Sequence, residues 1–223
     1  MDFSLLVSTE WIYQYIYKNK CSGGSLHQHL RCRKKRRKRY GAYSRRGQIP
    51  YQVSIDERPA IVDTRSRFGD WELDTVIGKN HKQALVTIAE RKARLSVSKK
   101  VNRKTSRCVT DAIIELLMPL KEWVHTLTAD NGREFSGHIE VAKKLEADFY
   151  FAHPFSSWER GLNENTNGLI RQYFPKKHDF TTITQKQLDK VMNKLNNRPR
   201  KCLGFKTPNE VFFGIKPTVA LAT

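Results

Sequence analysis

Cysteine is scarce in this sequence, and the positions of the few cysteines exclude a common class of metal site. The 223 residues contain four of them, Cys21, Cys32, Cys108 and Cys202. No two form a C-x-x-C pair, and their spacings match no zinc-binding template. We therefore expect four free thiols in a protein that works in a reducing compartment.

Long hydrophobic runs are also missing. The most apolar window, residues 112–120, is interrupted by Glu115 and Pro119. It is far shorter than the ~20 apolar residues that a membrane-spanning helix needs. Residues 3–7 are too few for the hydrophobic region of a signal peptide. The sequence therefore predicts a cytoplasmic protein with no membrane partner.

Acidic residues are outnumbered, and the excess of basic residues is concentrated in one segment. Lys and Arg total 41 against 22 Asp and Glu, which gives a formal net charge of +19. A charge of this size indicates a polyanionic partner, most often nucleic acid. About half of the net charge lies in residues 31–46, which contain no acidic residue. The basic residues of this segment are Arg31, Arg33, Lys34, Lys35, Arg36, Arg37, Lys38, Arg39, Arg45 and Arg46.

Residues 31–46 have no apolar periodicity and are followed by Gly47 and Pro50, so we interpret them as an extended basic linker that contacts phosphates. A charge run that is merely solvated is the alternative. The aromatic content of 10% and the hydrophobic content of 39% exclude a wholly disordered basic chain. Ahead of the linker, residues 9–17 are expected to form a helix, and residues 25–30 a second short one.

After the linker, the apolar pattern predicts a mixed sheet flanked by helices. Alternation over residues 71–78 and 95–101, with an apolar run at 84–89 between them, predicts three antiparallel strands. Two further strands, at 124–129 and 148–152, are each expected to be connected by a helix. The expected helices begin near Thr105, His138, Leu162, Thr184 and Pro208. The expected domains are therefore an N-terminal remnant (1–30), the linker (31–60) and an α/β core (61–216).

Three acids stand at positions from which a metal centre can be built. Asp74 lies within a strand, Asp130 lies at a strand end, and Glu164 lies in the first turn of a helix whose face also carries Asn167 and Arg171. Carboxylate oxygens suit Mg²⁺, and two such ions about 4 Å apart can activate and stabilise the two oxygens of a phosphodiester displacement. Spacing alone leaves Glu72 as a rival to Asp74, because the two share a strand face. Weaker rivals are Asp63, Asp70 and Asp111.

Three motifs carry a resemblance to a known family. Residues 71–74 (W-E-L-D) resemble the W-E-x-D motif of insertion-sequence transposases, and residues 130–135 (D-N-G-R-E-F) resemble their D-N-G-x-E-F motif. Residues 153–171 are similar to the long third block, and the interval from Asp130 to Glu164 is the one that the family shows. The sequence resembles the IS-thirty family, within the superfamily that includes retroviral integrases, from about Ser8 to Gly214.

The resemblance implies a fold, a site and an activity. The fold is RNase H-like, and the catalytic, metal-binding acids are Asp74, Asp130 and Glu164, which favours Asp74 over Glu72. The cofactor is a pair of Mg²⁺ ions, with Mn²⁺ as a substitute. The activity is hydrolysis of double-stranded DNA at transposon ends, followed by strand transfer by the freed 3′-OH. The active form is expected to be a homo-oligomer associated with the bacterial nucleoid.

Other residues of the motifs receive narrower predictions. Glu72, Asn131 and Glu134 are expected to support the acids. Contacts to DNA are expected from the linker and from residues on or after the catalytic helix, although a solvated helix face is the alternative. These residues are Arg33, Lys34, Lys35, Arg36, Arg37, Lys38, Arg39, Asn163, Asn167, Arg171, Lys176 and Lys177. Trp158 suits base stacking or loop anchoring, and His153 suits a structural role.

Two other functions remain open at this stage. An RNase H-like nuclease would hydrolyse DNA without strand transfer, and an inactive remnant would only bind it. Members of the family usually carry an N-terminal helix-turn-helix region, and the sequence begins within or just after that region. We therefore expect an N-terminally truncated transposase that binds DNA with little sequence preference.

Overall fold

The computed structural model describes residues 8–29, 49–79, 83–154 and 156–215. The basic linker, including Arg33–Arg39, lies outside the described residues. The chain divides into two units, Met1–Gly47 and Gln48–Thr223. In the first, helix α1 (Thr9–Cys21) begins where the Ser8 side chain accepts a hydrogen bond from the Trp11 backbone N–H. A short 3₁₀ helix, Leu26–His29, follows it, and both helices were predicted.

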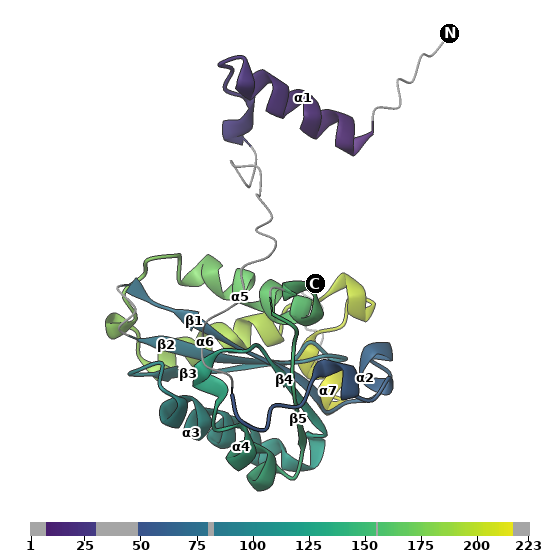
Figure 1. The fold of residues 1–223 in the computed structure, drawn as a ribbon, viewed down its shortest axis with the longest axis vertical. Coiled ribbons are helices and arrows are strands. Elements are labelled where there is room, and N and C mark those ends of the chain that lie inside the picture. The colour runs from purple at the N-terminus through teal and green to yellow at the C-terminus, as the bar shows by residue number, and fades with distance from the viewer. Residues whose placement is uncertain (1–7, 30–48, 80–82, 155, 216–223) are drawn as a thin grey trace, which may run out of the picture. The chain divides into compact units, whose positions relative to one another are not determined.

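The second unit is built on a five-stranded mixed sheet with the order β3-β2-β1-β4-β5 (Figure 1). Strand β2 pairs antiparallel with both β1 and β3, whereas β4 pairs parallel with both β1 and β5. The predicted meander of three strands and the two helix-connected strands are thus confirmed. The strand bounds are Asp70–Ile77 (β1), Ala84–Glu90 (β2), Ser96–Val101 (β3), Thr126–Ala129 (β4) and Asp148–Phe151 (β5).

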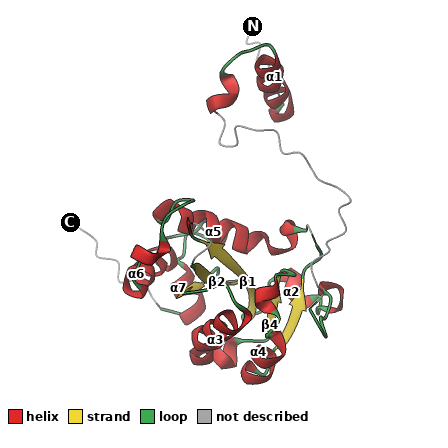
Figure 2. Ribbon diagram, turned by 60° about the vertical axis from the view of Figure 1, so that its left-hand side comes forward, coloured by secondary structure: helices red, strands yellow, loops and turns green. Residues whose placement is uncertain are grey.

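Helices cover both faces of the sheet (Figure 2). Alternate residues of the central strand point to opposite faces, so this strand contributes side chains to both. Trp71 and Leu73 of β1 lie in the larger apolar cluster, with residues of α3 (Ser106–Leu117) and α4 (His138–Leu145). Val76 lies in the second cluster, with residues of α5 (Gly161–Tyr173) and α6 (Gln185–Asn196). The polar residues Glu72 and Asp74 alternate with Trp71 and Leu73, so they face the side of α5.

Local signals set the ends of several helices. The Thr105 side chain caps α3, and a capping box formed by Thr184 and Gln187 begins α6, both as predicted. Helix α7 (Pro208–Phe213) opens with a second capping box, and its Phe212 packs edge-on against Trp71 with ring centroids 5.9 Å apart. Pro119 lies in the 3₁₀ helix Met118–Trp123 that continues α3. Within the described residues, no helix is long and apolar enough to cross a membrane.

The core unit begins earlier than the predicted residue 61. Ile49 is 6% exposed and lies in the larger apolar cluster. The Phe151 backbone N–H donates to the Val53 carbonyl at 2.9 Å, and Ser54 forms a parallel bridge with Phe151. Val53 and Ser54 therefore lie beside β5 at the edge of the sheet, and the second unit begins at Gln48, within the stretch predicted as linker (31–60). A short helix, α2 (Ile61–Thr64), follows them.

Candidate active site at the junction of β1 and β4

The register of the two central parallel strands brings Asp74 and Asp130 together. Glu72 of β1 pairs with Thr128 of β4, so continuing the same register places Asp74 beside Asp130, the first residue after β4. Neighbouring strands lie about 4.8 Å apart, and side chains two positions apart share a face. The two predicted catalytic acids therefore lie side by side.

One cationic side chain lies between these acids. Arg160 directs Nη1 to within 3.8 Å of Asp74 Oδ1 and Nη2 to within 3.4 Å of Asp130 Oδ2. The same Nη1 donates a hydrogen bond of 3.1 Å to the carbonyl of Leu73 on β1. The Arg160 side chain is 12% exposed, against 25% for Asp74 and 40% for Asp130. Arg160 belongs to the third motif, but its spacing offered no sign of this contact, and sequence reasoning missed it.

Asp74 is held in one orientation by neighbours on three elements. The Asn167 amide of α5 donates to Oδ2 at 2.7 Å, and the Thr75 backbone N–H donates to Oδ1 at 2.8 Å. The Thr87 hydroxyl of β2 donates to the Asn167 Oδ1 at 2.9 Å, which fixes that amide. Burial raises the pKa of Asp74 above its ordinary value; Arg160 opposes this shift, and the Asp130 carboxylate adds to it.

The turn after Asp130 depends on close packing around the Glu134 carboxylate. The Gly132 backbone N–H donates to Asp130 Oδ1 at 2.9 Å. A Cβ on Gly132 would lie 2.6 Å from the Glu134 carboxyl carbon, so a larger residue there would require the Glu134 side chain to move. Glu134 is 8% exposed, accepts a hydrogen bond from the Thr75 hydroxyl at 3.0 Å and pairs with Lys104 at 2.7 Å. Its contacts are therefore those of a residue that supports the turn.

Asn131 ties this turn to the neighbouring strand and to the segment before the core. Its Nδ2 donates to the Ala152 carbonyl at 2.5 Å, and its Oδ1 accepts from the Gln52 side chain. The ends of β4 and β5 are therefore joined directly beside Asp130. The supporting role expected of Asn131 stays a prediction.

Helix α5 is bonded to β1 at three successive turns along one of its faces. The contacts involve helix positions spaced four residues apart, which lie above one another on an α-helix. Each joins a helix residue to a position farther along β1: the Asn163 N–H to Glu72 Oε2 at 3.0 Å, the Asn167 amide to Asp74 at 2.7 Å, and Arg171 Nη2 to the Ile77 carbonyl at 2.8 Å.

These bonds revise the predicted roles of the helix residues. Asn163, which was expected to contact DNA, is fully buried in this structure. Asn167 and Arg171 are partly buried, and their polar groups bind β1. On the same helix, Ile170 is buried whereas Tyr173 is 39% exposed. In the sequence, Asn163, Asn167 and Arg171 are recognisable only as polar residues on one helix face. Their partners on β1 are remote in sequence, so these contacts could not be predicted.

Glu164 lies in the first turn of α5 and is exposed. It precedes Asn167 by three positions, which places the two on neighbouring parts of one helix face. Among the described residues, no three His, Cys, Asp or Glu side chains lie close enough together to hold one metal ion. The structure thus brings Asp74 and Asp130 together and keeps Glu164 apart, one helical turn from the amide that binds Asp74.

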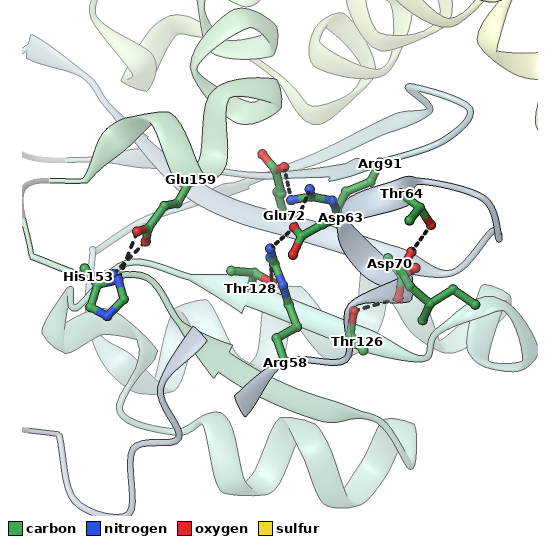
Figure 3. A network of polar contacts seen from close by, with 11 residues as sticks. Arg58, Asp63, Thr64, Asp70, Glu72, Arg91, Thr126, Thr128, His153 and Glu159 are labelled. Atoms are coloured by element: carbon green, nitrogen blue, oxygen red, sulfur yellow. Dashed lines mark hydrogen bonds and ion pairs between the residues drawn. The ribbon is translucent and has the colours of Figure 1, made fainter. Parts of the chain in front are cut away.

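The rival acids are engaged elsewhere. Glu72 is 1% exposed at its side chain, and its Oε1 pairs with Arg91 Nη1 at 2.8 Å (Figure 3). Asp70 is fully buried and accepts from Arg67 and from Thr126. The remaining pairs join Asp63 to Arg58 and Arg91, and Asp111 to Arg107. Glu72 shares a face with Asp74, as predicted, but its carboxylate is used to hold Arg91 and the start of α5.

The segment before α5 is held by a histidine between two carboxylates. His153 Nδ1 lies 2.9 Å from Glu159 Oε1, as Figure 3 shows, and Nε2 lies 2.9 Å from Asp56 Oδ2. Hydrogen bonds to Glu159 and then to Asp56 raise the pKa of His153. These contacts agree with the structural role predicted for His153. Trp158, in the same segment, is 74% exposed, and Lys176 and Lys177 beyond α5 are also exposed.

The donor set of this site fits a hard divalent cation. The carboxylates of Asp74 and Asp130 already share one positive group, the Arg160 guanidinium, and oxygen donors of this type suit Mg²⁺ or Mn²⁺. Glu164, in the first turn of α5, offers a further carboxylate but does not lie close enough to join these two in the structure. Among the described residues, Cys21, Cys108 and Cys202 are free thiols.

Comparison with known proteins shows which proteins the chain resembles. No protein-family model matches it. It is 51% identical over 208 residues to the transposase for insertion sequence element IS4351 of Bacteroides fragilis, which covers 93% of the chain and 64% of that protein. It is 39% identical over 218 residues to the transposase InsI for element IS30A of Escherichia coli K12, covering 93% and 56%. The chain therefore spans about three fifths of the length of these relatives.

The fold has a counterpart among solved structures. The catalytic core domain of BIV integrase superposes with a TM-score of 0.51 at 20% identity, over 65% of the chain and 93% of that domain. The mixed sheet flanked by helices is thus RNase H-like, as the motifs implied. The chain is thus similar, over 93% of its length, to transposases of insertion sequences that include the IS30 element.

Proposed function

We propose that this chain carries the catalytic core of a DNA transposase. Its reaction is the metal-dependent hydrolysis of phosphodiester bonds at transposon ends, followed by attack of the freed 3′-OH on a second phosphodiester. The catalytic acids are Asp74, Asp130 and Glu164. The substrate is double-stranded DNA of the bacterial nucleoid, and the active form is a homo-oligomer.

The observation that carries this proposal is the convergence of Asp74 and Asp130 on one positive group. Two carboxylates from adjacent strands repel one another unless a cation lies between them. Both belong to motifs of the IS30-type family, and both are braced by neighbours that are themselves held in place. Such bracing supports a role in which the positions of the acids matter.

Each part of the site has a task in this reaction. Asp74 and Asp130 would hold Mg²⁺, and Glu164 would complete the ligand set from α5. When bound, a pair of such ions activates the attacking oxygen and stabilises the leaving oxygen of a phosphodiester. Asn167 keeps Asp74 in one rotamer, and the turn around Gly132 keeps Asp130 beside it. The basic linker and the exposed Lys176 and Lys177 would bind the DNA backbone.

The proposal is tested with the full chain, supercoiled plasmid and a short duplex with a free 3′-OH end. We expect Mg²⁺- or Mn²⁺-dependent nicking of the plasmid and covalent joining of the labelled duplex to it. The substitutions Asp74→Asn, Asp130→Asn and Glu164→Gln each reduce both products to the level seen with EDTA. Asp111→Asn, which changes an exposed acid paired with Arg107 on α3, leaves both products unchanged.

The outcomes separate the alternative functions. Nicking without joining would contradict strand transfer and identify a nuclease. Duplex binding without either product, in the presence of Mg²⁺ and Mn²⁺, would identify an inactive DNA-binding remnant. Activity that survives all three substitutions would overturn the assignment of the acids.

A further inference from the structure

The position of Arg160 gives it a second possible state. It is the residue before α5 and ends the 3₁₀ helix Ser157–Arg160, so its backbone belongs to the segment that links β5 to the catalytic helix. Its guanidinium reaches back to β1, where it meets Asp74 and Asp130. It therefore lies where a cation bound by these two acids would also have to lie.

Arg160 is held closely by the backbone of β1 but only loosely by the two acids. Among the described residues, its one hydrogen bond of good length is that to the Leu73 carbonyl, at 3.1 Å. The distances to the two acids, 3.8 and 3.4 Å, are too long for strong charge-assisted bonds, which are about 2.7–2.9 Å. Its Nε is buried and has no hydrogen-bond partner among the described residues. The guanidinium offsets part of the acids' charge without forming short hydrogen bonds to them.

The charges of the site then oppose simultaneous occupancy. Two carboxylates and one guanidinium carry a net charge of −1. A divalent cation held by the same carboxylates would be repelled by the guanidinium at short range, in a partly buried site where screening is weak. A DNA phosphate offers Arg160 another anionic partner, and guanidinium groups bind phosphates well.

We propose that Arg160 acts as a counter-ion that competes with the divalent cation for Asp74 and Asp130 and moves to a DNA phosphate when substrate binds. Arg160 thereby couples metal binding to DNA binding, so that the acids take up their ions chiefly when DNA is present. This inference rests on the proposed function and adds a role for a positioning residue that is not one of the acids.

The first test measures Mg²⁺ binding to the full chain by isothermal titration calorimetry, in the absence of DNA. A nearby charge changes the affinity of a carboxyl group for a proton by 1–3 pKa units, so we expect Arg160→Gln to tighten Mg²⁺ binding by about 10-fold or more. Arg160→Lys keeps the positive charge and should remain near the wild-type affinity. Thermal unfolding in EDTA verifies that each variant is folded.

A matched control removes the same charge nearby. Arg133 is exposed and lies in the turn that follows Asp130. Arg133→Gln should change Mg²⁺ affinity by less than about twofold, because an exposed charge is screened by solvent and salt. Equal tightening in Arg133→Gln and Arg160→Gln would overturn the proposal, since the effect would then reflect net charge alone. Weaker binding in Arg160→Gln would overturn it as well.

The second test measures the coupling itself. The affinity for a short fluorescein-labelled duplex is read by fluorescence anisotropy, with NaCl or MgCl₂ at matched ionic strength. Coupling between two ligands is reciprocal, so Mg²⁺ should strengthen duplex binding by the wild-type chain more than by Arg160→Gln. An equal Mg²⁺ effect in both proteins would overturn the role of Arg160 in coupling.

Failure of this inference can be told apart from failure of the proposed function. Asp74→Asn and Asp130→Asn should abolish the Mg²⁺ isotherm of the wild-type chain and that of Arg160→Gln. If they do, yet Arg160→Gln binds Mg²⁺ no more tightly than wild type, only the competition is refuted. If Mg²⁺ binding is insensitive to both acids, the metal centre itself is refuted, and this inference with it.

Discussion

Glu72 and Arg91 form a nearly buried ion pair, and breaking it should be among the most damaging single changes in the core. Their side chains are 1% and 5% exposed, and they meet at 2.8 Å. The other carboxylate oxygen accepts the Asn163 N–H at the start of α5. The Glu72 carboxylate therefore binds two buried groups, Arg91 and the Asn163 N–H, which have no access to water as an alternative partner.

The expected cost follows from what Glu72→Ala leaves behind. Arg91 would keep only Asp63, at 3.4 Å with a 64% exposed side chain, while burial and the nearby Arg58 already lower the pKa of Arg91. Removing one partner of a buried pair costs about 3–5 kcal/mol. We expect Glu72→Ala and Arg91→Ala each to lower the free energy of unfolding by that amount. Urea denaturation followed by the fluorescence of the buried Trp71 measures it.

A double substitution distinguishes the ion pair from loss of packing. Replacing both residues by methionine removes the uncompensated charge, so Glu72→Met with Arg91→Met should cost well under the sum of the two single changes. Asp111→Ala, in an exposed pair, should cost less than about 1 kcal/mol. Single losses below about 1 kcal/mol, or fully additive losses, would show that the pair is not what fixes α5 to β1.

Three further predictions concern the site, the core and the linker. Asn167→Ala removes the 2.7 Å hydrogen bond to Asp74 and should lower the rate of DNA cleavage by about 10- to 100-fold. The control Lys186→Ala, on α6, should leave the rate unchanged. A rate for Asn167→Ala equal to that of the wild type would show that Asn167 does not position Asp74. Burial raises the pKa of Glu90 from its ordinary 4.5 to about 7. The protonated form is therefore favoured in the folded state, and about 3 kcal/mol of stability that is present below pH 4.5 should be lost as the pH rises through 7. Urea denaturation should show the free energy of unfolding falling across that pH range, and Glu90→Gln should abolish the fall. Deleting residues 31–46 should reduce the slope of log K against log salt for duplex binding by several units, at about 0.9 per phosphate contact, and an unchanged slope would identify a solvated charge run.

Local signals in the sequence predict the elements of this fold well. A threonine followed by a helical apolar stripe marks the start of α3, and the pair Thr184 and Gln187 marks that of α6. Such caps act over three or four residues, so a single sequence displays them fully. The start of the core is different. Residues 49–56 lack a repeating pattern and are held by Ile49 and one bridge to β5, so they resemble a linker in sequence.

The site was predictable only in part, because its geometry depends on pairings between remote segments. The motifs identify Asp74 and Asp130, and the parallel register of β1 and β4 then brings them together. Nothing local distinguishes Glu72, two residues earlier on the same face, from Asp74. The difference arises from Arg91, on another strand, which takes the Glu72 carboxylate. The polar face of α5 was ambiguous for the same reason, since its partners lie on β1.

The contacts of α5 link the stability of the core to the chemistry of the site. Glu72 holds the first turn of the helix, which carries Glu164, and Asn167 in the next turn holds Asp74. A shift of α5 along β1 would therefore move Glu164 and release Asp74 at the same time. Arg160 lies directly ahead of this helix, so its movement toward DNA would pull on the same turn. The bond from the Asn163 N–H to the buried Glu72 resists that pull, so Arg160 can leave the acids while the first turn of α5 stays bound to β1.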